Sequence, residues 1–154
     1  MNYSECIENA RTRIGNYCKA CPECNGRACK NQMPGPGAKG IGDTAIRNYD
    51  KWKEIRVQMD TIVENKPVDT SLELFGKKFL YPFFAGPVGA VGLHYGDCLD
   101  DVRYNDILVS ACAKYGIAAF TGDGLDSNVM VAATKAIGKT DGIGIPTVKP
   151  WNID

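Results

Sequence analysis

The feature that most constrains the fold is the alternation of short apolar runs with longer amphipathic segments after position 80. Helical spacing of apolar side chains is found in the segments 100–115 and 127–137. Three apolar runs flank these helices and predict buried strands, at 82–87, 117–121 and 142–149. Strands that alternate with helices favour parallel pairing, because each helix carries the chain back to the same edge of the sheet. The sequence therefore predicts an α/β fold.

The preceding part of the chain does not follow this pattern. A short amphipathic helix is expected over 3–14, and a second helix is expected from Asp43 or Thr44 to about Met59. Residues 72–81 are expected to form a hairpin that turns at Gly76 and Lys77. We therefore predict two parts, which are a helical, cysteine-rich extension over residues 1–65 and an α/β part over residues 66–154.

The charge balance and the apolar segments exclude several classes of function. The chain has 18 basic and 18 acidic residues, scattered along it, so it has no basic face of the kind that binds nucleic acid. No segment approaches the roughly 20 consecutive apolar residues of a membrane span, and the first residues do not resemble an export signal. We expect a cytoplasmic protein that binds neither nucleic acid nor membrane. Association of identical subunits stays open.

Four of the seven cysteines form a compact motif with the spacing Cys-x2-Cys-x2-Cys-x4-Cys, made by Cys18, Cys21, Cys24 and Cys29. Four thiolates within a dozen residues can enclose zinc or an iron–sulfur cluster. The alternative is a loop of free or redox-reactive thiols. The sequence predicts a metal site and leaves open whether it takes zinc or an iron–sulfur cluster. Cys112 lies on a helix face and is expected in the core.

Candidate ligand-binding residues follow the ends of the three expected strands. In parallel α/β folds, ligands bind at the carboxyl ends of the strands. The first end, 86–90, is almost free of large side chains, so a flat ring could lie against its backbone. The second end, 121–124, carries a hydroxyl, and the third, 147–151, carries a cation and an aromatic ring. Ordinary loop closures rich in Gly and Pro are the alternative explanation.

The block from Asp69 to Asp97, which includes Asp69-Thr70-Ser71, Tyr81-Pro82 and Ala85-Gly86-Pro87-Val88-Gly89-Ala90, carries a family resemblance. It resembles the opening of the FMN-dependent 2-hydroxy-acid dehydrogenases and oxidases, the family of glycolate oxidase and lactate oxidase. The resemblance extends from about Ile46 to Trp151. It implies a TIM (βα)8 barrel, of which this chain would form the first two βα units and the third strand. A whole barrel takes about 250 residues, so we expect an N-terminal fragment of the enzyme.

The resemblance also implies roles for individual residues. Backbone at Pro87, Val88, Gly89 and Ala90 would pack beside the flavin ring. Thr121 would replace a flavin-contacting Ser, and Lys149 would replace a Gln at the pyrimidine edge of the ring. Trp151 would replace a Tyr near the substrate. The last two are departures from the family pattern, and the loss of the Tyr hydroxyl puts the substrate's identity in doubt.

The resemblance implies oxidation of an L-2-hydroxy acid, such as lactate or glycolate, to the 2-oxo acid by hydride transfer to FMN. It places the catalytic base on a later strand, beyond Asp154, so no catalytic residue is assigned and the chain alone is expected to be inactive. His94 is the one histidine, and we expect it to be a hydrogen-bonded structural residue. The alternatives are another flavin barrel, such as a flavin-type isopentenyl-diphosphate isomerase, and a small metal-binding or electron-transfer module built on the cysteines.

Overall fold

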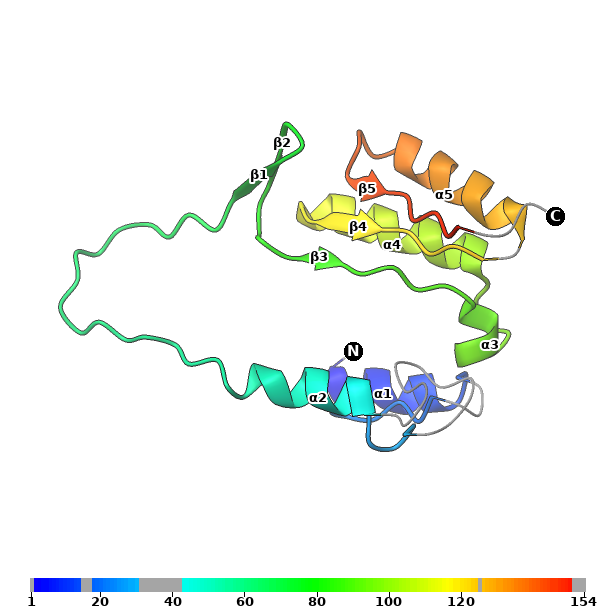
Figure 1. Ribbon diagram of the computed structural model, residues 1–154, viewed down its shortest axis with the longest axis horizontal. Helices are drawn as coiled ribbons and strands as arrows, with labels where there is room; N and C mark the ends of the chain where they lie inside the picture. The colour runs from blue at the N-terminus through cyan, green and yellow to red at the C-terminus, as the bar shows by residue number, and fades with distance from the viewer. Residues whose placement is uncertain (1, 15–17, 31–42, 125, 151–154) are drawn as a thin grey trace. The chain divides into compact units, whose positions relative to one another are not determined.

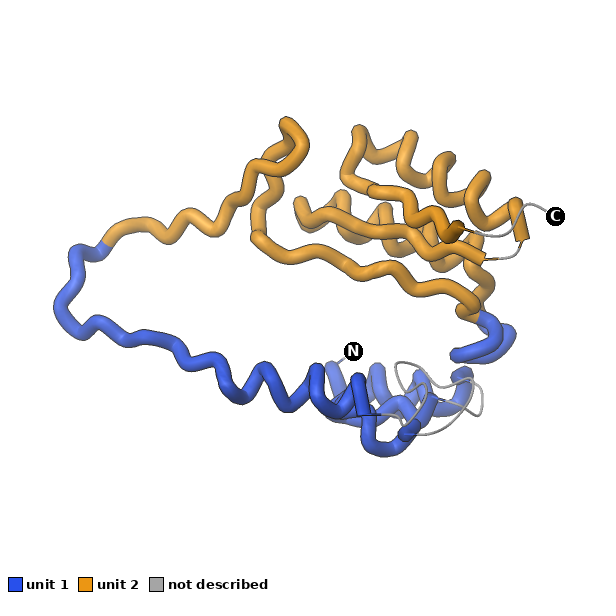
Figure 2. Tube along the Cα trace, in the orientation of Figure 1, with its two compact units in different colours: residues 1–65, 92–98 blue, residues 66–91, 99–154 orange. Residues whose placement is uncertain are grey.

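The chain divides into two compact units in a computed structural model that describes residues 2–14, 18–30, 43–124 and 126–150. The first unit comprises Met1–Asn65 and Gly92–Cys98, and the second comprises Lys66–Val91 and Leu99–Asp154 (Figure 2). None of the described helices combines the length and the apolar character that crossing a membrane requires.

The first unit begins with α1 (Tyr3–Arg11), which a capping box between Asn2 and Glu5 initiates. The helix is shorter than the expected 3–14. The Thr12 hydroxyl donates to the carbonyl oxygen of Asn9 at 2.8 Å, an interaction that competes with continued helical hydrogen bonding. No residue of α1 is fully buried.

The second helix, α2 (Asp43–Trp52), begins where the sequence predicts and ends seven residues before Met59. Its inward side is anchored by Ile46, which is buried. Trp52 and Ile55 continue the apolar spacing but are exposed, so burial does not support a further turn. Short helices are stable mainly through tertiary packing, and this explains the early end. A third, short helix, α3 (Val91–Tyr95), carries the chain from the second unit into the first (Figure 1).

The second unit opens with the expected hairpin, formed by β1 (Leu72–Leu74) and β2 (Lys77–Phe79). Its turn lies one residue earlier than predicted. Leu74 pairs with Lys77, and the two residues between them, Phe75 and Gly76, have φ of 53° and 71°. Positive φ at both central residues matches the twist of a two-residue hairpin, and glycine accepts it most easily. The glycine therefore takes the second central position of the turn.

A parallel sheet follows, with the strand order β3-β4-β5. The strands are β3 (Phe84–Ala85), β4 (Ala118–Phe120) and β5 (Gly144–Ile145), and they are connected through α4 (Asp101–Tyr115) and α5 (Ser127–Gly138) (Figure 1). This confirms the predicted order of strands and helices and the predicted parallel pairing. The strands are shorter than the apolar runs that predicted them.

Local signals in the sequence set the ends of α4. The carboxylate of Asp100 accepts the Arg103 N–H at 2.7 Å and caps the start of the helix. Gly116, at φ 65°, ends it in the left-handed conformation. Asp126 caps α5 in the same way, through the Asn128 N–H at 2.9 Å.

The core of the second unit lies between the sheet and its two helices. Its buried members come from α4, β4 and α5, and they are Val109, Cys112, Ala119 and Ala136. Cys112 is in the core as expected, and burial raises the pKa of its thiol. Val102 and Ile107, which the spacing also placed inward, are exposed instead, because Asn105, Val109 and Cys112 form the buried side of α4.

The 82–87 segment is not the buried strand that its apolar sequence predicts. Phe83 and Phe84 are each 58% exposed. Ala85 lies against the core between the sheet and the helices, and the Phe84 ring lies 5.0 Å from that of Phe120 on β4, centroid to centroid. Because side chains alternate along a strand, one sheet face meets α4 and α5, and the other carries these aromatic rings.

Candidate functional site

The loop after β3 and the loop after β4 leave adjacent parallel strands at the same edge of the sheet, and they approach each other closely. A Cβ on Gly122 would lie 1.9 Å from the carbonyl oxygen of Val88, and one on Gly89 would lie 2.5 Å from that of Asp123. Real Cβ atoms essentially never come within 3.0 Å of other atoms in this way. Both glycines are therefore required by backbone packing between the loops.

Asn105, on α4, fixes the second of these loops. Its side chain is fully buried, and its Oδ1 accepts the N–H of Gly122 at 3.0 Å. Its Nδ2 has no hydrogen-bond partner among the residues that the structure describes. A buried hydrogen bond of this kind holds the loop on the helix, because breaking it would leave a buried backbone donor without a partner.

Thr121 immediately follows β4 and is fully buried. Its Oγ1 also lacks a hydrogen-bond partner within the described part of the chain. Buried polar groups in native proteins nearly always have partners. Within the described residues, two such groups lack a partner near the end of β4. They are the Thr121 hydroxyl and the amide nitrogen of Asn105, whose oxygen accepts the Gly122 N–H from α4.

Asp123 joins the loop after β4 to the segment after β5. Its Oδ2 accepts the backbone N–H of Lys149 at 2.6 Å, and its Oδ1 accepts the N–H of Gly124 at 2.8 Å. The Lys149 ammonium in turn donates to the carbonyl oxygen of Asp123 at 3.2 Å. Asp123 is buried, and these bonds hold the Lys149 cation at the same strand ends as Thr121.

The structure thus connects several of the residues singled out in the sequence. Val88 and Gly89 lie against the loop of Thr121, and Lys149 is tied to that loop through Asp123. Pro87 and Ala90 are exposed members of the first loop. Trp151 lies outside the described residues.

Sequence reasoning missed two residues of this arrangement, Asn105 and Asp123. A signal existed for each of them. Asn105 is a polar residue four positions before Val109 on the inward side of a helix, and Asp123 lies three residues beyond a strand end.

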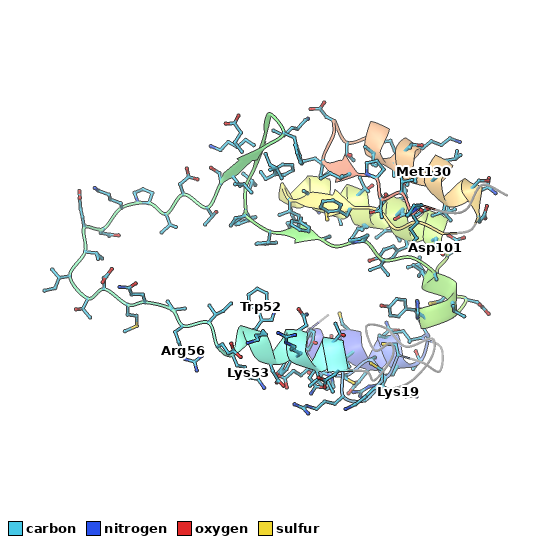
Figure 3. The ribbon with its side chains drawn as sticks, viewed as in Figure 1. Lys19, Trp52, Lys53, Arg56, Asp101 and Met130 are labelled. Carbon is cyan, nitrogen blue, oxygen red and sulfur yellow. The ribbon has the colours of Figure 1, made fainter. Side chains whose placement is uncertain are left out.

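The loop after β3 is also fastened at its far end. The Val91 N–H lies 3.2 and 3.3 Å from the two carboxylate oxygens of Asp101. Asp101 lies in the first turn of α4 (Figure 3). His94 lies on α3, with its ring 6.2 Å from that of Tyr95. The hydrogen bond expected for it is not made at Nδ1, which is buried without a partner in the described ranges.

The four cysteines of the motif all line one small cavity in the first unit, with a volume of about 40 Å³. Burial raises the pKa of the Cys29 thiol, and the negative charge of Cys24 raises it further, with smaller contributions from Cys18 and Cys21. In the described part of the chain, no three Cys, His, Asp or Glu side chains are already arranged as ligands of an ion. The thiols are therefore neighbours that have not closed into a coordination shell.

A parallel sheet with two helices on one face, and with polar groups at the carboxyl ends of its strands, defines a protein of the α/β class, in which ligands commonly bind at that edge. The family model for FMN-dependent dehydrogenases matches residues 35–140, more than half of the chain. The chain belongs to the FMN-dependent dehydrogenase family, which confirms the resemblance seen in the sequence. It is a flavin-dependent oxidoreductase sequence, and its cofactor is FMN. No curated protein and no solved structure matches the chain significantly.

The match includes the two interlocked loops, with Thr121, and ends before Lys149. It begins after the cysteine motif.

Proposed function

We propose that the intact protein oxidises an L-2-hydroxy acid, such as lactate or glycolate, to the corresponding 2-oxo acid. The observation that carries the proposal is the family match across the strand ends, where the Thr121 hydroxyl has no hydrogen-bond partner among the described residues. Bound FMN supplies the chemistry by accepting a hydride equivalent from the substrate carbon. The residues of this chain bind and orient the cofactor.

We further propose that the three parallel strands belong to a (βα)8 barrel, as the family resemblance implies. The packing of the two sheet faces supports this proposal in addition to the family resemblance. Both helices pack on one face of the sheet, and the other face carries Phe84, 58% exposed, in contact with the Phe120 ring. A barrel interior is filled by side chains from such inward faces. Closure would remove the exposed aromatic surface from water.

Each strand end contributes differently to the proposed site. The backbone at 87–90 lies beside the ring, with Gly89 and Gly122 keeping the two loops in contact. The hydroxyl of Thr121 bonds a polar atom of the flavin. Lys149, held by Asp123, places a positive charge near the pyrimidine edge. That positive charge would stabilise the negative charge that develops on the flavin during reduction, and so would favour reduction.

This chain contributes few residues to the substrate side of the proposed site. The family resemblance implies that Trp151 replaces a Tyr near the substrate. An indole has no hydroxyl, so this side chain would not donate a hydroxyl proton to the substrate. The proposal gives His94 no catalytic role and assigns the base that abstracts the substrate proton to none of the described residues.

The test is to express the chain together with any sequence that follows it and to record visible absorbance. A yellow protein with bound FMN, bleached anaerobically by L-lactate or glycolate, is the expected result. A folded protein that binds no FMN would overturn the proposal. Binding of FMN without reduction by any 2-hydroxy acid would refute the substrate class.

A pair of matched variants tests the role of the hydroxyl. Thr121→Val should weaken FMN binding by about fivefold, because one hydrogen bond of about 1 kcal/mol is lost. Thr134→Val is the control, since this exposed residue on α5 bonds only within its own helix. Equal FMN affinity in the two variants would contradict the assignment of Thr121.

A further inference from the structure

The cysteine motif lies in a loop that forms the centre of the first unit. In the described part of this unit, the buried residues are Ala20, Gly26 and Ile46. Two of them belong to the loop itself, between the first and the last cysteine of the motif. The third, Ile46, lies on α2 beside Ala45, against which Gly26 is packed. The interior of the unit is therefore built around the cysteine loop.

This interior is too small to stabilise the unit by apolar burial alone. Helix α1 buries no residue, and α2 buries only Ile46. Folds of this size that lack a sizeable core usually depend on a disulfide or a structural metal. Within the described residues, no cysteine is joined to another in a disulfide. A metal bound by the cysteines would supply the cross-link that such a small interior needs.

The loop is held against both helices in a way that gathers its thiols. The Tyr3 hydroxyl on α1 donates to the carbonyl oxygen of Pro22 at 2.7 Å. On the other side, a Cβ on Gly26 would lie 2.6 Å from that of Ala45, so the loop contacts α2 directly. Ala20 and Gly26 both have positive φ, 44° and 74°. The positive φ angles at these two residues turn the chain between the cysteines and explain how all four line one cavity.

We propose that Cys18, Cys21, Cys24 and Cys29 bind a metal through four thiolates and that this centre holds the first unit together. On binding, each thiol releases its proton to solvent and each sulfur forms one bond to the metal. The thiols now line a common cavity without ligand geometry. Small metal sites commonly close only when the metal binds, and the binding energy then stabilises the fold.

Zinc and an iron–sulfur cluster share this thiolate chemistry, and the experiment separates them. The chain is purified anaerobically, and its zinc, iron and acid-labile sulfide are measured together with its visible absorbance. About one zinc per chain, without colour, identifies a zinc site. Iron with sulfide and a brown colour identifies a cluster. Either outcome supports the site. Protein that binds neither zinc nor reconstituted iron and sulfide overturns it.

Matched variants locate the metal on these residues. The double variant Cys18→Ser/Cys24→Ser should lose the metal. The control, Cys6→Ser/Cys98→Ser, removes two exposed cysteines of the same unit and should keep it. Metal content that survives the first pair, or that both pairs lose equally, refutes the assignment.

A second measurement on the unaltered chain covers the case in which the first variant does not fold. Alkylation followed by mass mapping should label Cys6 and Cys98 at once. The four motif cysteines should react at least about tenfold more slowly until a chelator removes the metal. Equal labelling of all six in the metal-loaded chain refutes the proposal. A disulfide among the four in the anaerobic protein refutes it as well.

Discussion

Replacing Gly122 with alanine tests whether the two strand-end loops are locked together by backbone contact. The added Cβ would lie 1.9 Å from the Val88 carbonyl oxygen, whereas ordinary contact begins at 3.4 Å. The loops must therefore separate by about 1.5 Å, the difference between these two distances. The neighbouring contacts, at 2.6 Å to the Val88 carbonyl carbon and 3.0 Å to the Gly89 nitrogen, are backbone as well. No side-chain rotation can relieve them.

The expected cost follows from this geometry. Overpacking usually costs about 1–3 kcal/mol, and a rigid backbone clash belongs at the upper end. Movement of the loop also strains the 3.0 Å bond from the Gly122 N–H to Asn105, which adds about 1 kcal/mol. We expect Gly122→Ala to lower the free energy of unfolding by about 3–4 kcal/mol. At about 2–4 °C per kcal/mol for a chain of 154 residues, Tm should fall by about 6–16 °C.

Gly86→Ala is the matched control, because it makes the same change in the neighbouring loop. A Cβ on Gly86 meets nothing within 4 Å. Its effect should be small, or stabilising by up to about 1 kcal/mol through the unfolded chain. Urea and thermal unfolding followed by circular dichroism measure both variants. Midpoints for the two that agree within error would refute the close approach of the loops.

Three further predictions concern the second unit. Asn105→Ala should lower the free energy of unfolding by about 2–3 kcal/mol in urea, because it leaves the buried Gly122 N–H without a partner; no loss would contradict that bond. Asp100→Ala should cost about 1 kcal/mol in the same assay through loss of the α4 cap, and an unchanged midpoint would argue against the cap. The pKa of the Asp141 carboxyl is lowered, first by its hydrogen bond from Lys77 and then by the charge of that lysine. The stabilisation from the Lys77–Asp141 interaction should be present above the ordinary pKa of an aspartate and lost as the pH falls through the lowered pKa. An NMR titration should show that the pKa of Asp141 is lowered and that Lys77→Met abolishes the shift. An unshifted pKa for Asp141 would contradict the interaction.

Much of the fold could be predicted because its signals are local. Helical spacing over 100–115 predicted α4, and the apolar run at 117–121 predicted β4. Elements whose stability depends on distant partners were predicted less well. Helix α2 was expected to reach Met59, and the 82–87 run was expected to be buried. Periodicity shows which side of an element is apolar, but it cannot show whether another element covers that side.

The residues of the candidate site also differ in whether a local sequence pattern points to them. Thr121, Lys149 and the loop at 87–90 were singled out because they follow predicted strand ends, and the loop belongs to the block that resembles the family. Asn105 and Asp123 were not found, because their roles are long-range hydrogen bonds, across 17 and 26 residues of the chain. A polar side chain on a helix or in a loop does not reveal at the sequence level which backbone group it will meet.

The sequence by itself determined the order of strands and helices, the family and the spacing of the four cysteines, because each is written in neighbouring residues. Only the tertiary structure decided why Gly89 and Gly122 must be small, since each faces the backbone of the other's loop. It alone showed that the first unit is centred on the cysteine loop. Close packing joins residues that are far apart along the chain, and no local pattern encodes those distances.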